Sequence, residues 1–193
     1  SYSVTGVQTC ALPIYNLLVK KIIVRYVIYT LKHDSTYTPF TYLFSEKRVR
    51  RSLPSGKGFN VNIKGFIDRV DKKGAVRIVD YKTGSGEFKI KDTEALFDCK
   101  SDYNSKVLFQ LYLYAYLIDS QDPVVVSPYF IKSIANKGVA EQLITMDVIR
   151  EFEERLSILV SEIFDSAVPF TATENLKLCE KCPYYPVCYK EGR

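Results

Sequence analysis

The chain has 193 residues, of which 47% are hydrophobic and 25% charged, and its 27 Lys and Arg against 22 Asp and Glu give a formal net charge of +5. This composition predicts a globular α/β domain with a sizeable core rather than a disordered chain, and the basic excess is compatible with a nucleic-acid partner. The sequence has no apolar run of about 18 residues that could span a membrane and no secretory signal, so we expect neither a membrane-spanning nor a secreted protein.

The chain contains five cysteines, an odd number that indicates reduced thiols or a metal site rather than a set of disulfides. Without a secretory signal, this cysteine content predicts a cytoplasmic protein. The order G-x-x-x-x-G-K-[ST] of a phosphate-binding loop occurs nowhere, so we expect the chain to bind no nucleotide.

Residues 1–14 differ from the rest of the chain, because they carry no charge and show no hydrophobic period. The stretch GVQTCALPI resembles translated sequencing-adapter read-through, so we interpret 1–14 as a non-native or disordered tail and expect an N-terminally truncated fragment. From Tyr15 to Leu31, apolar residues recur at helical spacing and predict a helix. The sequence Lys32-His33-Asp34 is typical of a helix exit, which favours a solvated His33 near the helix dipole.

Two strands are predicted next, over residues 42–53 and 59–63. The second shows clear alternation, with Phe59, Val61 and Ile63 separated by polar residues. The first contains Glu46, a secondary candidate acid, and a basic run that could neutralise DNA phosphates. A solvated strand face explains such a run equally well; the run consists of Lys47, Arg48, Arg50 and Arg51.

The stretch 65–84, GFIDRVDKKGAVRIVDYKTG, is predicted to form a β-hairpin with a polar turn at Asp71–Gly74. Side chains alternate along a strand, so Asp80 and Lys82 share one face. A loop with an odd number of residues places Asp68 on that face as well, because directly opposed residues point the same way.

Two acids and a lysine on one face of a strand pair fit metal-assisted phosphodiester hydrolysis. Carboxylates are the oxygen ligands that Mg²⁺ prefers, and a bound metal lowers the pKa of water and screens phosphate charge. Lys82 would add a compact positive charge near the reacting groups. The alternative is a surface hairpin on which Asp68, Asp80 and Lys82 form an ordinary solvated ion pair.

The second half of the chain reads as helix, hairpin and helix. The helix predicted over 107–119 is apolar nearly all round, and its Gln110 and Tyr114 share one face. A hairpin is predicted around Asn136-Lys137-Gly138, followed by a helix from Asp147 to about Ser166. We expect that helix to bury Ile149, Phe152, Leu156, Leu159, Val160 and Ile163.

Three cysteines close to the C-terminus are separated by two and by five residues: Cys179, Cys182 and Cys188. Thiolates so close in sequence can hold one soft metal centre. Zinc sites and iron–sulfur clusters usually take four such ligands, so a fourth is expected from elsewhere in the chain.

The motifs GFIDRVD and IVDYKTG, followed by QLYLY and by the cysteine segment CEKCPYYPVC, resemble the PD-(D/E)XK nuclease superfamily in its RecB-like and AddB-like form. The resemblance covers roughly residues 45–190, with isoleucine in place of the proline of the family's name. It implies a restriction-endonuclease-like α/β core with a central mixed sheet flanked by helices over 15–170, and a cysteine-rich tail over 171–193.

The resemblance also implies roles for individual residues. Asp68 and Asp80 stand for the metal-binding acids and Lys82 for the catalytic lysine, with Gln110 and Tyr114 as further catalytic positions. The implied cofactor is Mg²⁺ or Mn²⁺, the implied substrate is DNA, and the implied activity is that of a deoxyribonuclease, acting as an exonuclease, in recombination and repair. A helicase subunit or fused helicase-like region is the implied partner; the alternative is a catalytically weak or idle DNA-binding or scaffold module of the same fold.

In the AddB-like branch the cysteine tail holds a [4Fe–4S] cluster whose fourth ligand is an upstream cysteine. The resemblance therefore implies such a cluster on Cys179, Cys182 and Cys188, with zinc as the second candidate. Here the upstream position is either missing or taken by Cys10, and Cys99 is a less favoured substitute, so we expect the chain as written to bind this metal poorly.

Overall fold

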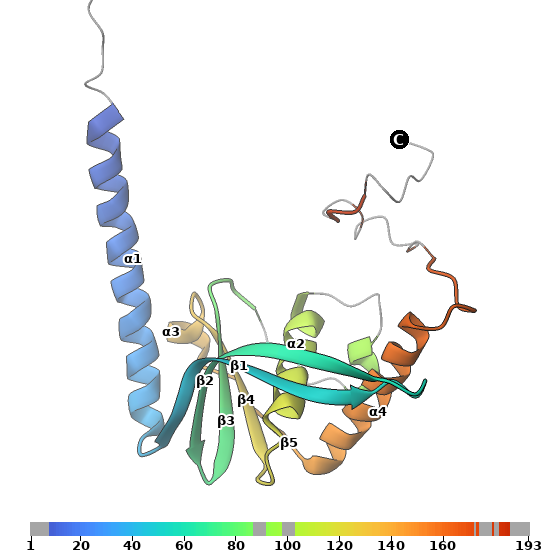
Figure 1. Cartoon of the computed structure of the whole chain (residues 1–193). Helices are drawn as coiled ribbons and strands as arrows, with labels where there is room; N and C mark the ends of the chain where they lie inside the picture. Colours follow the sequence, from blue (N-terminus) through green and yellow to red (C-terminus); the bar gives the residue numbers. More distant parts are fainter. Residues whose placement is uncertain are drawn as a thin grey trace, which may run out of the picture.

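The computed structural model describes residues 8–86, 92–97, 103–171, 173, 179 and 182–185. Its elements follow one another along the chain as a long helix, three strands, a 3₁₀ turn, a helix, a strand, a short helix, a strand and a last helix (Figure 1). Their bounds are α1 Gln8–Tyr37, β1 Thr41–Pro54, β2 Asn60–Lys73, β3 Ala75–Lys82, η1 Glu94–Phe97, α2 Tyr103–Ile118, β4 Val124–Phe130, α3 Ile134–Lys137, β5 Gln142–Ile144 and α4 Met146–Ile163.

The five strands form one mixed sheet in the order β1-β2-β3-β4-β5. Only β3 and β4 pair in parallel; the other neighbours are antiparallel. A parallel pair needs a crossover connection, and α2 lies in the chain between β3 and β4. Figure 1 shows α2 and α4 on one side of the sheet and α1 and α3 on the other. The predicted mixed sheet flanked by helices is therefore confirmed.

The β2–β3 hairpin is tighter than predicted. Pairing continues to Lys73 opposite Ala75, so that Gly74 alone connects the strands rather than the predicted segment 71–74. Gly74 has a φ of 73°, a conformation that glycine adopts without the steric cost of a Cβ atom.

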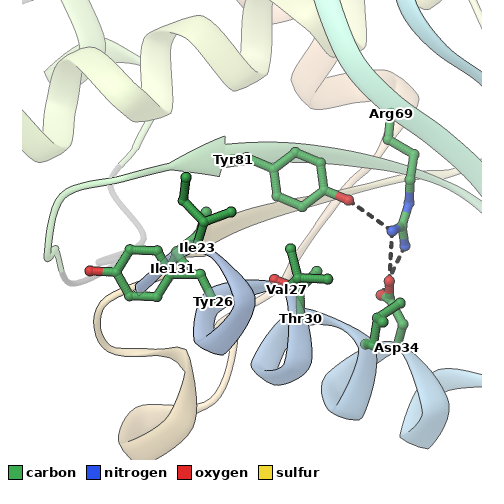
Figure 2. Close-up of a pocket in the computed structure, with 9 residues that line it drawn as sticks. Ile23, Tyr26, Val27, Thr30, Asp34, Arg69, Tyr81 and Ile131 are labelled. Carbon is green, nitrogen blue, oxygen red and sulfur yellow. Dashed lines mark hydrogen bonds and ion pairs between the residues drawn. The ribbon is translucent and has the colours of Figure 1, made fainter. Parts of the chain in front are cut away.

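A buried charged network joins α1 to the sheet. Asp71 and Arg77 face each other in the β2–β3 register, and both side chains are 0% exposed, with two hydrogen bonds of 2.8 Å between guanidinium and carboxylate. Arg69 extends the network by donating to Asp71 and, at 2.7 and 2.9 Å, to both carboxylate oxygens of Asp34 on α1 (Figure 2). Tyr129 of β4 also donates to Asp34, at 2.9 Å. Charge pairing thus holds the C-terminal part of α1 on the sheet.

Helix α1 is longer than predicted at both ends. It begins at Gln8 rather than Tyr15, and Lys32-His33-Asp34 does not end it, because Asp34 is held in place by Arg69 and the helix continues to Tyr37. His33 is half-buried with its ring edge-on to Tyr129 at 5.2 Å, so the expectation of a solvated histidine was wrong. Most of the helix projects beyond the sheet (Figure 1), and its large apolar residues are exposed there.

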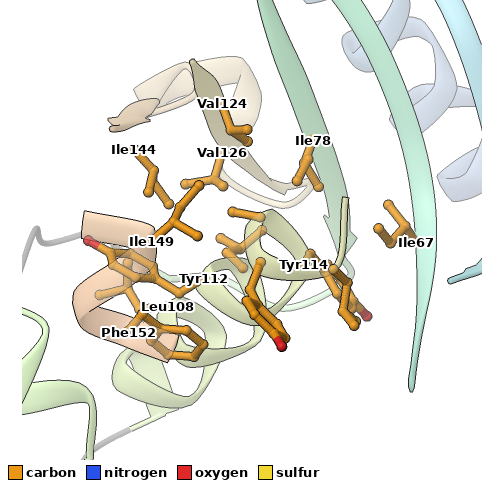
Figure 3. Packing of buried hydrophobic residues seen from close by; sticks show 14 of the residues in the cluster. Ile67, Ile78, Leu108, Tyr112, Tyr114, Val124, Val126, Ile144, Ile149 and Phe152 are labelled. Atoms are coloured by element: carbon orange, nitrogen blue, oxygen red, sulfur yellow. The ribbon is translucent and has the colours of Figure 1, made fainter. Parts of the chain in front are cut away.

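The main apolar core lies between the sheet and helices α2 and α4 (Figure 3). Helix α2 is buried on most of its surface, as its apolar composition predicted, and its Leu108 and Leu111 belong to the same core cluster as Ile78 and Val126. Helix α4 begins one residue before the predicted start, at Met146, after Thr145, which accepts a hydrogen bond from the Val148 N–H. Its predicted inner residues are buried or packed against the core except Ile163, which ends the helix and is 48% exposed.

The predicted second hairpin is present as the antiparallel pair β4–β5, but its connection differs from a simple turn. Residues 134–137 form the short helix α3, which ends at Gly138 with a φ of 68°. Within the described residues, no helix is both long enough and apolar enough to cross a membrane.

Replacing Asp71 by alanine tests the buried network. The variant leaves the fully buried Arg77 without its carboxylate, so we expect the free energy of unfolding to fall by about 3–5 kcal/mol. Urea denaturation measures this loss. The control is Lys72→Ala, which breaks the exposed ion pair with Asp122 (side chains 43% and 48% exposed) and should cost less than about 1 kcal/mol. Equal losses in the two variants would contradict a special role for the buried pair.

Candidate active site

The predicted acidic residues lie where β2 and β3 stop pairing. The antiparallel register runs from Lys73 opposite Ala75 to Arg69 opposite Val79, and Asp68 and Asp80 are the next residues on the two strands. Beyond this point the Asp68 carboxylate accepts a hydrogen bond of 2.8 Å from the backbone N–H of Tyr81. Because a side chain rather than a strand carbonyl satisfies this N–H, the two strands can separate without leaving it unpaired.

Strand β3 continues to pair with β4 on its other side as far as Lys82 opposite Phe130. The Lys82 ammonium lies 2.7 Å from Asp80 Oδ2 and donates a 2.8 Å hydrogen bond to Gln110 Oε1 of α2. The Gln110 amide in turn donates to the Tyr114 hydroxyl at 2.7 Å. Four of the five predicted catalytic positions are therefore linked in one chain of polar contacts between β3 and α2.

The two acids also influence the ionisation of Tyr114. Burial raises the pKa of Tyr114, and the negative charges of Asp80 and Asp68 raise it further, while the hydrogen bond from Gln110 opposes the shift. The structure thus brings Asp68, Asp80, Lys82, Gln110 and Tyr114 into one cluster.

Asp80 is held in an unfavourable environment for a charged carboxylate. Its side chain is 3% exposed, and burial raises its pKa even though the neighbouring Lys82 ammonium acts to lower it. Its buried Oδ2 atom accepts no well-aligned hydrogen bond from the described residues. The Lys82 ammonium, 2.7 Å away, is the described group that balances the charge on this oxygen.

Glu46, the secondary candidate acid, is not grouped with these two acids. It is exposed and adopts a positive φ of 49°, an uncommon conformation for a residue with a side chain. In the described ranges, no three or more His, Cys, Asp or Glu side chains come together to hold a metal. Protein ligands for a metal here would therefore come from the Asp68 and Asp80 carboxylates.

The opposite face of the same strands carries residues that the sequence analysis missed. Tyr81 lies between Asp80 and Lys82 in sequence, and its hydroxyl accepts a 2.9 Å hydrogen bond from Arg69, which also binds Asp34 (Figure 2). Arg69 itself follows Asp68 on β2. The alternation of charged Arg69, Asp71 and Arg77 with apolar Val70 and Ile78 indicates that the charged residues share one face of the sheet. Such alternation is typical of a solvated face, so it gave no sign that α1 covers these residues.

A cavity of about 390 Å³ lies beside this network, between α1 and the ends of β3 and β4. Ile23, Val27 and Ile131 supply apolar walls, and Tyr81 and Arg69 lie at one end (Figure 2). Arg69 directs its guanidinium to Asp34, Asp71 and Tyr81, so its charge is already compensated.

The cysteine segment is only partly described. Cys179 and Cys182 are half-buried, and the Cys182 N–H donates to the Cys179 carbonyl at 3.1 Å, so the two residues lie one turn apart. Cys99, Cys188 and the side chain of Cys10 lie outside the described residues.

A family model described as the PD-(D/E)XK nuclease superfamily matches residues 8–189. A search of curated proteins found no match. Among solved structures, one titled "Crystal structure of SSO0001" is similar, with 14% sequence identity and a TM-score of 0.42 over 92% of this chain and 72% of that one. Because the family model covers nearly the whole chain, the protein belongs to the PD-(D/E)XK nuclease superfamily, and its mixed five-stranded sheet flanked by helices is the restriction-endonuclease-like fold.

Members of this superfamily typically use divalent metals such as Mg²⁺. The donor set fits such an ion, because the Asp68 and Asp80 carboxylates lie next to each other where β2 and β3 stop pairing. Mg²⁺ usually takes one or two carboxylates and completes its coordination with water and phosphate oxygens.

The raised pKa of Asp80 leads to a prediction about stability. A carboxyl whose pKa is higher in the folded than in the unfolded state stabilises the fold when protonated, and that contribution is lost as the pH rises through the folded pKa. At neutral pH, Asp80→Asn should therefore raise the Tm in the presence of a chelator, because asparagine removes the cost of a buried charge. The gain should vanish as the pH falls below the ordinary aspartate value of 3.8.

Differential scanning calorimetry across this pH range provides the measurement. The control is Asp165→Asn, because a hydrogen bond from Lys57 lowers the pKa of Asp165 and its ionised form is the favoured one. That variant should show no gain in Tm. A lower Tm for Asp80→Asn at neutral pH would mean that the Lys82 ion pair outweighs the burial of Asp80.

Proposed function

We propose that this chain is a metal-dependent deoxyribonuclease domain of the RecB/AddB-like kind, acting on DNA in recombination and repair. The observation that carries the proposal is the cluster of Asp68, Asp80, Lys82 and Gln110 at the point where β2 and β3 separate. The membership of a nuclease superfamily supports the reaction class.

Each residue has a role that its contacts support. Asp68 and Asp80 hold a divalent cation, which when bound supplies an activated water and screens charge on the phosphate. The Lys82 ammonium is a positive charge beside these acids, placed to stabilise negative charge that builds up in the transition state.

Gln110 fixes the direction of the Lys82 side chain by accepting a hydrogen bond from its ammonium group, and the Tyr114 hydroxyl fixes Gln110 by accepting a hydrogen bond from its amide. Both orienting residues come from the buried helix α2, so the lysine is positioned by a rigid element rather than by a loop.

The finer parts of the proposal rest on the sequence motifs. The proposal includes exonuclease action, association with a helicase subunit or helicase-like region, and a cytoplasmic location. It also includes a [4Fe–4S] cluster on Cys179, Cys182 and Cys188, with zinc as the alternative; the short distance between Cys179 and Cys182 along the backbone is compatible with a shared metal.

The cleavage of labelled DNA in Mg²⁺ or Mn²⁺ tests the reaction. Asp80→Ala should abolish cleavage, because a metal ligand is lost, and EDTA should do the same. Lys82→Ala should lower kcat by about 100-fold or more while it leaves Mn²⁺ affinity nearly unchanged. Lys72→Ala, at the exposed pair with Asp122, serves as the control and should cut at the parental rate. Parental rates for both Asp80→Ala and Lys82→Ala would contradict the proposed nuclease.

Metal analysis tests the cysteine site independently of cleavage. After anaerobic reconstitution with iron and sulfide, the purified chain should take up iron and the brown colour of a cluster only in less than stoichiometric amount, because three cysteines leave the cluster one ligand short. Cys182→Ser should lose this iron, whereas Cys99→Ser should keep it. Zinc in place of iron would correct the metal, and iron retained by Cys182→Ser would remove the cysteine segment from the proposal.

A further inference from the structure

The β1–β2 hairpin carries an unusual charge distribution. Between residues 47 and 67 the sequence contains Lys and Arg but no Asp or Glu. Two of these cations are compensated by acids from other elements: Arg51 by Asp119 and Glu153, and Lys57 by Asp165. The other four form no ion pair with any residue that the structure describes; they are Lys47, Arg48, Arg50 and Lys64.

Three of these four cations lie on the side of the hairpin that faces away from α2. Gly65 faces α2, since a Cβ atom there would lie 3.0 Å or less from Tyr114 and Leu117 side-chain atoms. Alternation then turns its neighbours Lys64 and Phe66 outward. The strand register places Arg50 directly opposite Lys64, and Arg48 directly opposite Phe66, and all four side chains are exposed. We call these four residues, Arg48, Arg50, Lys64 and Phe66, the outer hairpin face.

This arrangement is unfavourable for the chain alone. Like charges directly opposed on neighbouring strands destabilise a sheet, and Arg50 and Lys64 are so opposed. Phe66 adds a large ring that is 49% exposed beside them. An anion that carries flat apolar groups relieves both costs at once, because its charge compensates the cations and its rings cover the aromatic side chain.

We propose that the outer hairpin face binds a single-stranded segment of nucleic acid, with phosphates on Arg48, Arg50 and Lys64 and an unpaired base stacked on Phe66. Basic grooves combined with exposed aromatic rings bind single strands in this way, because every base offers a face for stacking. A base inside a duplex is already stacked and leaves no free face for Phe66, so the aromatic residue favours the single strand.

The outer hairpin face is close to the candidate active site along β2, but it is on the side of the hairpin away from α2, whereas the site includes Gln110 and Tyr114 of α2. Phe66 precedes Asp68 by two residues on β2, which corresponds to about 6.6 Å along a strand. This inference rests on the proposed nuclease for its biological meaning, but binding is measured without cleavage.

Fluorescence anisotropy in EDTA tests the proposal with a labelled oligothymidylate and a duplex of the same length. The parental chain should bind the single strand more tightly than the duplex. Phe66→Ala should weaken single-strand binding at least about fivefold and leave duplex binding unchanged. The double variant Arg48→Gln, Arg50→Gln should weaken binding and lower the slope of log K against log salt by about 1.4, or about 0.7 for each lost phosphate contact.

The matched control is the double variant Lys20→Gln, Lys21→Gln, which removes the same charge from exposed positions on α1. It should keep the parental slope. Thermal unfolding of Arg48→Gln, Arg50→Gln should give an unchanged or higher Tm, because the opposed charges at Arg50 and Lys64 are relieved.

The possible results separate this inference from the proposed nuclease. If the chain cleaves DNA but the hairpin and control variants bind alike, the proposed binding role of the outer hairpin face is wrong and the proposed nuclease activity stands. If binding depends on the hairpin residues but Mg²⁺ and Mn²⁺ give no cleavage, the binding role of this face is supported and the proposed nuclease activity is wrong. Tighter duplex binding that is insensitive to Phe66→Ala overturns the single-strand proposal.

Discussion

The ion pair between Asp71 and Arg77 fixes how β2 and β3 align, and the candidate site depends on that alignment. The two residues are directly opposed and fully buried, and each guanidinium contact is 2.8 Å. A slip of one residue would turn one partner to the other face of the sheet and leave two unpaired buried charges. The same register makes Asp68 and Asp80 the next residues on the two strands, so a structural ion pair determines where the acidic cluster forms.

The network around this pair also connects the candidate site to the face of the sheet that α1 covers. Arg69 follows Asp68 on β2, and Tyr81 follows Asp80 on β3. The Arg69 guanidinium donates a 2.9 Å hydrogen bond to the Tyr81 hydroxyl on the face that α1 covers. Asp34 of α1 binds Arg69, and although burial opposes it, hydrogen bonds from Arg69 and Tyr129 lower the pKa of Asp34. Helix α1 is therefore attached to the strands through Arg69, which directly follows Asp68 of the candidate site in the sequence. Buried charges are costly to desolvate, and here they fix a unique arrangement of strands and helix.

Local patterns in the sequence predicted most of the sheet and the cluster on β3. Alternation and periodicity act over a few residues, so the hairpin, the buried helix α2 and the pairing of Gln110 with Tyr114 could be read directly. The Asp34–Arg69 contact could not, because it joins residues 35 positions apart that no local pattern relates. The same contact explains the missed end of α1: helix-exit signals near His33 are weaker than the tertiary charge pairing that holds the following turn.

Gly65 shows how a residue without a functional group can limit variation at this site. A Cβ atom there would lie 2.7 Å from a Leu117 methyl carbon and 3.0 Å from the Tyr114 ring. The methyl group can rotate away, but the ring is held by Gln110, which in turn holds Lys82. Any larger residue at position 65 would therefore shift the lysine through the tyrosine and glutamine. In a saturation mutagenesis screen for activity, substitutions of Gly65 would impair activity as those of the acidic residues do, although glycine contributes no functional group to the site.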